Sequence, residues 1–109
     1  MTNNPVINSP YTRFSGDALH GWQPIVTPAW VQLDAIYVRS ADVPVHTVAD
    51  GLDMTGRVHG HVSGWWRTVK GDWLGVVNYA IPFADGRQQK LELRDQLIPG
   101  YALSKRETA

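Results

Sequence analysis

The chain has 109 residues, of which 43% are hydrophobic and only 18% are charged, so it has room for one packed domain and is unlike a wholly disordered chain. Ten basic residues balance ten acidic ones, and this balance disfavours both a strongly basic nucleic-acid clamp and a strongly acidic mimic of nucleic acid. Cysteine is absent, which excludes a disulfide framework, a thiolate nucleophile and a cysteine-ligated zinc site.

The beginning of the chain gives no sign of secretion or membrane insertion. It has neither the basic start nor the apolar run of a secretory signal, and no segment approaches the roughly 18 apolar residues that span a bilayer. We therefore expect a cytoplasmic protein without a membrane partner. A net charge of zero provides little repulsion between copies, which is compatible with an oligomer.

Residues 1–28 differ in composition from the rest of the chain. Four of the seven prolines lie there, and each one removes a backbone donor and favours an extended residue before it. This composition predicts a proline-rich extended arm, with a short helical turn after Ser15 as an alternative. The arm also carries large apolar side chains, at Tyr11, Phe14, Leu19, Trp22 and Ile25. It is expected either to lie back on its own domain or to dock on a neighbouring subunit or another partner.

From residue 29 the pattern changes to short β-strands. Residues 29–33, 36–39 and 43–48 are strand candidates, although Pro44 restricts the last of these to an edge or to a strand start. A turn follows at residues 49–51, and the segment to Gly56 is expected to be a loop.

The clearest strand pattern extends from residue 56 to residue 98. Alternating, aromatic or β-branched segments predict strands at residues 57–62, 65–69, 73–81 and 88–93, with a last short strand at residues 101–103. The expected turns lie at residues 63–64, 70–72, 82–87 and 97–100. Gly75, inside a predicted strand, indicates a bulge or a tight bend. Five to six short strands with frequent turns predict an all-β sandwich or small barrel.

Tryptophan is abundant for so small a domain. Each aromatic side chain can bury roughly 150–250 Å², so aromatic residues are expected at the core or its rim. The candidates are Trp30, either Trp65 or Trp66, Trp73 and Tyr79.

The segments Gly64-Trp65-Trp66-Arg67 and Gly71-Asp72-Trp73-Leu74-Gly75-Val76-Val77-Asn78-Tyr79 resemble the SH3 domain, which carries a tryptophan pair followed by a glycine-containing hairpin. The order of strands and turns is also similar to that of SH3-like small barrels. This resemblance implies an SH3-like barrel of five to six antiparallel strands at residues 29–103, followed by a frayed tail at residues 104–109. Val77 stands where the family has a ligand-binding proline, so recognition of Pro-x-x-Pro peptides is not implied.

A second resemblance extends over more of the chain. Pro28-Ala29-Trp30-Val31, Gly56-Arg57-Val58, Gly71-Asp72-Trp73, Val76-Val77-Asn78-Tyr79 and Asp95-Gln96-Leu97-Ile98-Pro99 are similar to segments of small actinobacterial or phage-type proteins. That similarity implies an SH3-like or Tudor-like barrel and no particular chemistry.

Two histidines are the first candidates for site chemistry. His59 and His61 lie at positions i and i+2 of a predicted strand and therefore share one face. They are weak candidates for a metal site, with His46 or Asp50 as a further ligand. Alternatively, they are the solvent-facing residues of an alternating strand, in which case no metal or cofactor is bound.

An enzyme is not expected. Loop and flanking carboxylates could in principle form an acid–base pair, but loop aspartates more often bond to their own turns. These carboxylates are Asp34, Asp42, Asp50 and Asp53. The sequence contains neither a glycine-rich phosphate loop nor a nucleophile elbow.

Interleaved aromatic and basic residues predict a binding surface instead. Exposed tryptophan beside arginine is typical of protein interfaces, and the predicted partner-binding residues are Trp66, Arg67, Trp73 and Tyr79. The alternative is a nucleic-acid-binding barrel that uses the same aromatic face, with Arg57, Arg67, Lys70, Arg87 and Lys90. Because the net charge is zero, we favour a non-catalytic protein-binding or assembly module whose partner is another protein or a further copy of the chain.

Overall fold

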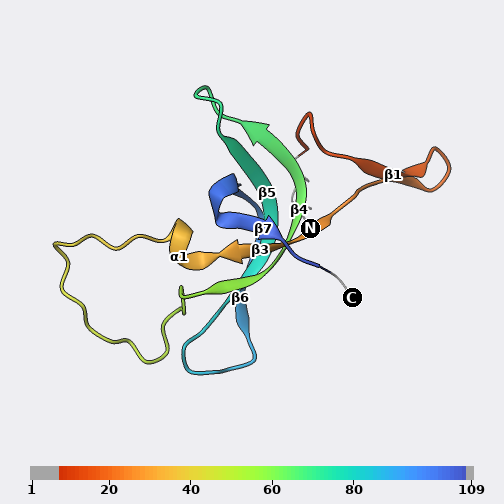
Figure 1. Cartoon of the computed structure of the whole chain (residues 1–109). Coiled ribbons are helices and arrows are strands. Elements are labelled where there is room, and N and C mark those ends of the chain that lie inside the picture. Colours follow the sequence, from red (N-terminus) through yellow and green to blue (C-terminus); the bar gives the residue numbers. More distant parts are fainter. Residues whose placement is uncertain (1–7, 108–109) are drawn as a thin grey trace, which may run out of the picture.

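The computed structural model describes residues 8–107, which contain two separate antiparallel sheets (Figure 1). The smaller sheet is a hairpin of β1 (Phe14–Asp17) and β2 (Gly21–Pro24). The larger sheet has five strands, β3 (Thr27–Gln32), β4 (Arg57–Arg67), β5 (Trp73–Pro82), β6 (Lys90–Pro99) and β7 (Leu103–Lys105). The all-β fold class predicted from the sequence is confirmed.

The larger sheet has the strand order β6-β5-β4-β3-β7. Strands β4, β5 and β6 follow one another as a meander, whereas β7 returns to the other edge and pairs with β3. The 3-10 turn η1 (Gly100–Ala102) makes this connection. β6 and β7 are the two edge strands and do not pair with each other, so the sheet is not closed into a barrel.

Aliphatic residues form the core on one face of this sheet. Alternation along β3 and β5 turns one set of side chains inward, and the buried residues that pack together there are Ala29, Val31, Leu33, Val62, Val77, Ile81, Ile98 and Ala102. Val76 is also buried, but it precedes Val77 in β5 and lies on the other face of the sheet. Within residues 8–107 no tryptophan is fully buried, so of the two expected positions, core or rim, the structure shows the rim for Trp65 and Tyr79. Trp65 packs against the core from its rim. Trp30 is half-buried and alternates with the buried Val31, so it lies on the other face of the sheet.

Two predicted turns are instead parts of continuous strands. Residues 63–64 lie within β4, where the pairing with β5 shifts between Val62 and Gly64, so a β-bulge replaces the turn. Residues 97–98 lie within β6. The second bulge falls between Val77 and Tyr79 of β5 and not at Gly75. Gly75 instead allows the side chains of Leu103 and Trp65 to pack close to the β5 backbone, because a Cβ at this position would contact both of them.

The segment between β3 and β4 also differs from its prediction. Residues 33–36 form the single helical turn α1 (Leu33–Ile36), which buries Leu33, and residues 36–39 and 43–48 are not strands. Residues 37–56 form a long excursion (the long loop) that pairs with the sheet only through the isolated bridge of Leu52 with Phe83. β-branched residues alone do not make a strand when no neighbouring strand supplies hydrogen bonds.

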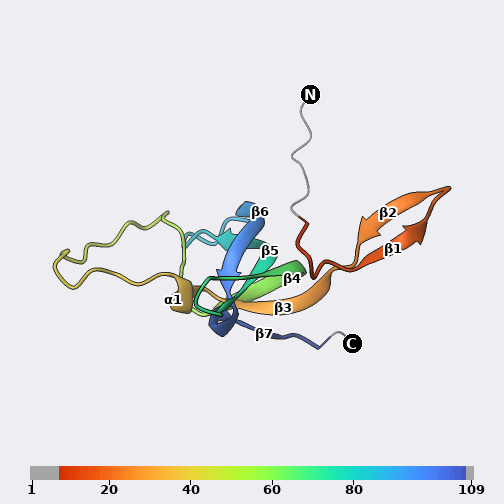
Figure 2. The same cartoon turned by 90° about the horizontal axis from the view of Figure 1, so that it is seen from above.

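The predicted arm contains a hairpin rather than a helical turn after Ser15. β3 begins at Thr27, within the predicted arm, and the chain leaves the sheet after Lys105. Residues 1–7 of the arm and residues 108–109 of the tail lie outside the described part of the chain. The hairpin and the long loop project from opposite sides of the sheet, as both views show (Figures 1 and 2). They lengthen the molecule to 55 × 37 × 35 Å.

Candidate protein-binding surface

Residues 9–12 lie against the free edge of β4. Strand β3 pairs with β4 only as far as Val62, and within residues 8–107 no other strand pairs with β4 beyond that point on this side. Ser9 supplies one partner, because its Oγ accepts a hydrogen bond of 2.8 Å from the backbone N–H of Trp65. The approach requires glycine at position 64, where a Cβ would meet the hydroxyl oxygens of Ser9 and Thr12.

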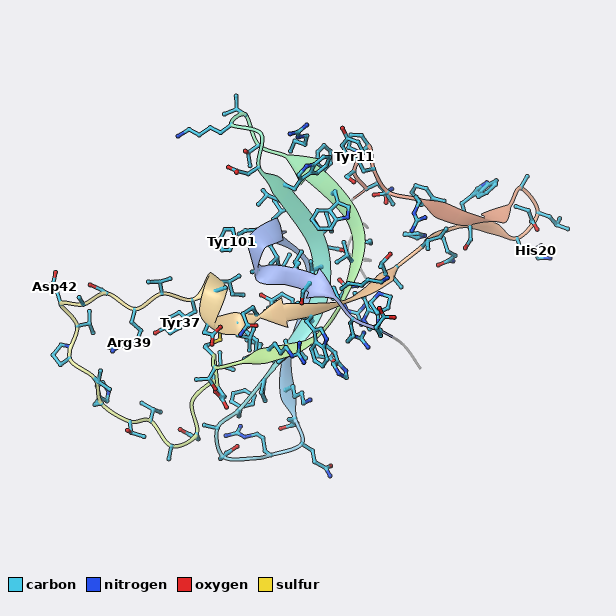
Figure 3. All side chains as sticks on the ribbon, viewed as in Figure 1. Tyr11, His20, Tyr37, Arg39, Asp42 and Tyr101 are labelled. Atoms are coloured by element: carbon cyan, nitrogen blue, oxygen red, sulfur yellow. The ribbon has the colours of Figure 1, made fainter. Side chains whose placement is uncertain are left out.

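The same segment folds back on itself and thereby places Tyr11. The backbone N–H of Ser9 donates to Thr12 Oγ1 at 2.8 Å, and the N–H of Thr12 donates to the carbonyl of Ser9 at 3.1 Å. Tyr11 N–H donates to Ser9 Oγ at 3.2 Å. This turn holds the Tyr11 ring edge-on to Trp73, with 5.0 Å between the ring centroids. Figure 3 shows Tyr11 beside the end of the sheet where β4 and β5 are joined.

Three aromatic rings surround an open apolar pocket at this end of the sheet. Trp65 also meets Trp73 edge-on, with centroids 6.3 Å apart and an angle of 89° between the rings. Gly100 joins Tyr11, Trp65 and Trp73 in lining a pocket of about 450 Å³. Gly75 lies opposite Trp65 in the sheet, and the absence of a side chain there leaves room for the indole. Aromatic rings held in this way form a preformed apolar pocket that a ligand side chain can occupy.

Arg67 adds a positive charge to the rim of this pocket. Arg67 and Trp73 are cross-strand partners, and the guanidinium lies 4.7 Å from the Trp73 ring centroid. The guanidinium also donates to the carbonyl of Gly71 at 3.0 Å. Thr68 and Asp72 close the turn between β4 and β5 through a backbone hydrogen bond of 2.9 Å. The turn thus fixes the arginine over the tryptophan face, which is a favourable cation–π geometry.

We call Tyr11, Trp65, Arg67 and Trp73 the aromatic–arginine surface. The three rings can pack against an apolar group, and the guanidinium can donate hydrogen bonds to a carboxylate or a carbonyl.

Two of the four sequence-predicted binding residues lie on this surface, namely Arg67 and Trp73. Trp66 follows Trp65 in β4 and therefore lies on the opposite face of the sheet, where it is cross-strand partner to Leu74. Tyr79 lies farther along β5, is half-buried against the core, and has a pKa raised by that burial.

Sequence reasoning placed Tyr11 among the apolar residues of the arm and either Trp65 or Trp66 at the core or its rim, and it named neither Tyr11 nor Trp65 as a partner-binding residue. The one local signal for Tyr11 is its place in Ser9-Pro10-Tyr11-Thr12, a composition typical of a turn. No pattern in the sequence connects that turn with β4, because the contact depends on where β3 stops pairing.

The five basic residues of the nucleic-acid alternative are divided between the two ends of the sheet. Arg67 and Lys70 lie at the turn that joins β4 to β5. Arg57 lies at the other end of β4, about 30 Å away at the usual rise per residue. Arg87 and Lys90 lie near the turn that joins β5 to β6, and Arg87 pairs with Asp85 at 2.6 Å.

His59 and His61 share one exposed face of β4, as alternation predicts. The ring centroids of His59 and Trp30 lie 4.8 Å apart. The Arg57 guanidinium stacks on the same Trp30 ring, 3.9 Å from its centroid. Both histidines line a cavity of about 250 Å³ with Glu92 and Arg94 among its walls. His46 and Asp50, the suggested further metal ligands, do not line this cavity. Among residues 8–107 no three His, Asp or Glu side chains are arranged to hold a metal ion.

Two of the four candidate acid–base carboxylates, Asp34 and Asp53, accept hydrogen bonds at the two ends of the long loop. Asp53 accepts hydrogen bonds from the backbone N–H and hydroxyl of Thr55 at 3.1 and 2.6 Å, and these bonds lower the pKa of the Asp53 carboxyl. Asp34 accepts from Gln32 Nε2 at 2.7 Å and from the Gly56 N–H at 3.3 Å. This role is the one expected for loop aspartates.

No protein-family model matches the sequence, and no curated protein or solved structure is significantly similar to the chain. Over residues 8–107 there is also no helix with the length and apolar character needed to cross a membrane.

Proposed function

We propose that this protein is a non-catalytic protein-binding or assembly module that recognises its partner through the aromatic–arginine surface. The observation that carries the proposal is the pocket formed by Tyr11, Trp65 and Trp73 with the Arg67 guanidinium at its rim. Tyrosine, tryptophan and arginine are the residues most enriched among those that dominate protein interfaces.

The exposure of these rings supports a role in recognition. Trp73 is 39% exposed and Tyr11 is 52% exposed, although both are large enough to contribute to a core. A ring that is already held by neighbouring rings loses little side-chain entropy when a partner covers it. The preferred ligand is an apolar side chain next to an acidic group, because the pocket is apolar and the Arg67 guanidinium lies against Trp73 at its rim.

The proposed fold for this module is a partly open SH3-like barrel. Three features support that assignment: the meander of β4, β5 and β6, the 3-10 turn η1 that follows it, and the return of β7 to pair with β3. The aromatic–arginine surface lies at the turn between β4 and β5 in this arrangement.

The alternative function is nucleic-acid binding, and one observation favours it. Arg57 stacks on the Trp30 ring and His59 meets the same ring edge-on, on the face of the sheet opposite the core. Aromatic rings beside basic groups are how single strands are bound. Binding of this kind weakens strongly as salt concentration rises. The division of the other basic residues between two ends of the sheet makes this the second candidate.

A pull-down from lysate with the full chain as bait, with and without nuclease, separates the two functions. The experiment compares the wild type with Trp73→Ala, and partners are identified by mass spectrometry. A discrete protein that survives nuclease and is lost with Trp73→Ala supports the proposal. Recovery that disappears with nuclease, or that does not depend on Trp73, contradicts it.

A further inference from the structure

The backbone of β4 has an edge without a strand partner near the turn to β5. The backbone N–H of Thr68 donates to the carbonyl of Asp72 at 2.9 Å, so Thr68 directs its N–H toward β5. Successive residues of an extended chain direct their backbone groups to alternate sides, so Arg67 and Trp65 direct theirs to the opposite edge. The 2.8 Å hydrogen bond from the Trp65 N–H to Ser9 Oγ agrees with this direction.

Two backbone groups on this edge are available to a further strand. Ser9 bonds only the N–H of Trp65. Within residues 8–107 the Trp65 carbonyl and the Arg67 N–H have no hydrogen-bond partner. We call these two groups the open edge of β4. An acceptor and a donor on one edge of a strand are the template on which another extended chain pairs, because its backbone supplies the complementary groups at the same spacing.

The open edge borders the aromatic–arginine surface. Trp65 and Arg67 are two residues apart in β4, and both side chains lie on the core side of the sheet, where one lines the apolar pocket and the other lies at its rim. Residues directly opposite each other on neighbouring strands have adjacent side chains. An added strand would therefore place one side chain beside Trp65 and, two positions away, another beside Arg67.

The charge of Arg67 favours an acidic residue at the second of these positions. The guanidinium donates to the carbonyl of Gly71 at 3.0 Å, and within residues 8–107 no carboxylate forms an ion pair with it, including that of Asp72 in the same turn. Lys70 adds a second positive charge to this turn. A carboxylate can still accept hydrogen bonds from the guanidinium, because its planar fork carries several donors.

We propose that the partner is an extended segment of another protein, which adds a strand to the open edge of β4. An apolar side chain of this strand enters the pocket beside Trp65, and an acidic side chain two positions away meets Arg67. In strand addition the main-chain hydrogen bonds supply affinity and alternate side chains supply specificity. The inference rests on the proposed function, because it uses the same side chains, and it adds a requirement for the partner's backbone.

The first test is the spacing of the two side chains in a peptide probe. The probes are short capped threonine peptides with one leucine and one glutamate, separated by no, one or two threonines. Binding to the full chain is followed through the backbone amide signals of Trp65 and Arg67 by NMR, at peptide concentrations up to about 1 mM. The peptide with one intervening threonine should bind most tightly, because the other two spacings place leucine and glutamate on opposite faces of a strand.

The second test is methylation of the peptide backbone, one nitrogen at a time, in the peptide that binds most tightly. A methyl group removes the donor and occupies the space between the strands. Affinity should fall roughly tenfold or more at the positions that face β4 and change little at the positions between them, which face solvent. The expected alternation is the same for a parallel and an antiparallel strand, and the unaffected positions are the matched controls.

The outcomes separate this inference from the proposed function. Binding that is insensitive to methylation, or equally sensitive at every position, would overturn strand addition and leave recognition by side chains intact. Alternating sensitivity that persists in full strength in Trp73→Ala would support strand addition and contradict the proposed role of the pocket. No binding by any probe up to about 1 mM, or an Arg67 N–H already protected from hydrogen exchange without peptide, would overturn strand addition as well.

Discussion

Apolar side chains are buried on one face of the five-stranded sheet and exposed in its two projections, the hairpin of β1 and β2 (the arm hairpin) and the long loop. In the sheet and the adjoining α1, Val31 and Leu33 are completely buried, and the face around them is aliphatic. In the arm hairpin and the long loop, Leu19 and Val45 face solvent although their chemistry is the same. The comparison teaches that apolar side chains stabilise the fold in the sheet, whereas those of the projections are exposed and contribute little to the core.

The largest expected effect is a difference in the free energy of unfolding between a variant of a core leucine and a variant of an arm leucine. Leu33→Ala removes a completely buried side chain from α1 and should lower the free energy of unfolding by about 2–5 kcal/mol. Leu19→Ala at the exposed hairpin turn is the matched variant, and it should change stability by no more than about 0.5 kcal/mol. Urea denaturation followed by tryptophan fluorescence measures both values. Equal losses would contradict the division between sheet and projections.

A smaller loss is expected where the arm joins the sheet. Ser9→Ala removes the acceptor for the backbone N–H of Trp65, and an unsatisfied donor costs about 1–3 kcal/mol when it stays buried. Ser104→Ala, an exposed serine of β7, is the control. Because Tyr11 also depends on Ser9, acrylamide should quench tryptophan fluorescence more strongly in the Ser9 variant. Unchanged quenching would show that Tyr11 is held by another contact.

The smallest effect concerns pH and is confined to the arm hairpin. Hydrogen bonds from His20 and Leu19 lower the pKa of the Asp17 carboxyl below its ordinary value of 3.8. A carboxyl whose pKa is lower in the folded state than in the unfolded state stabilises the turn at pH values above its unfolded-state pKa. This contribution is lost as the pH falls through the folded-state pKa. Titration followed by NMR should give an Asp17 midpoint below 3.8.

The His20→Ala variant provides the control for this titration. It should move the Asp17 midpoint upward, because the largest cause of the lowered pKa is the hydrogen bond to the His20 side chain. Resonances of the core, such as those of Val31, should not change over the same acidic range if the hairpin opens alone. A core that changes together with the turn would contradict the independence of the two regions.

The sheet could be predicted largely from alternation, because one buried face imposes a period of two on its strands. The pattern of residues 57–62 and 73–81 corresponds to parts of β4 and β5. The turn assigned to residues 63–64 was wrong, since a serine–glycine pair fits a bulge as well as a turn. Residues 43–48 were predicted as a strand from β-branched composition, which carries no information about whether a partner strand is available.

Two of the four residues of the aromatic–arginine surface could be predicted, because they are close together in the sequence. Arg67 and Trp73 flank a short hairpin turn, so the sequence itself brings them together. Tyr11 is more than fifty residues from Trp65, and the hydrogen bond of Ser9 to Trp65 depends on the end of β3. Contacts of that kind follow from tertiary pairing and leave no periodic signal.

The most direct test of the central claim compares two tryptophans of similar exposure on opposite faces of the sheet. Trp73 is 39% exposed and Trp66 is 37% exposed. The measurement is the affinity of the captured partner, by calorimetry, for Trp73→Ala and Trp66→Ala, after each variant is shown to unfold cooperatively. Loss of a residue that dominates an interface costs at least about 2 kcal/mol, which is roughly a 30-fold weaker affinity. The account predicts that loss for Trp73→Ala and less than about a threefold change for Trp66→Ala. A loss for Trp66→Ala with no change for Trp73→Ala would contradict it.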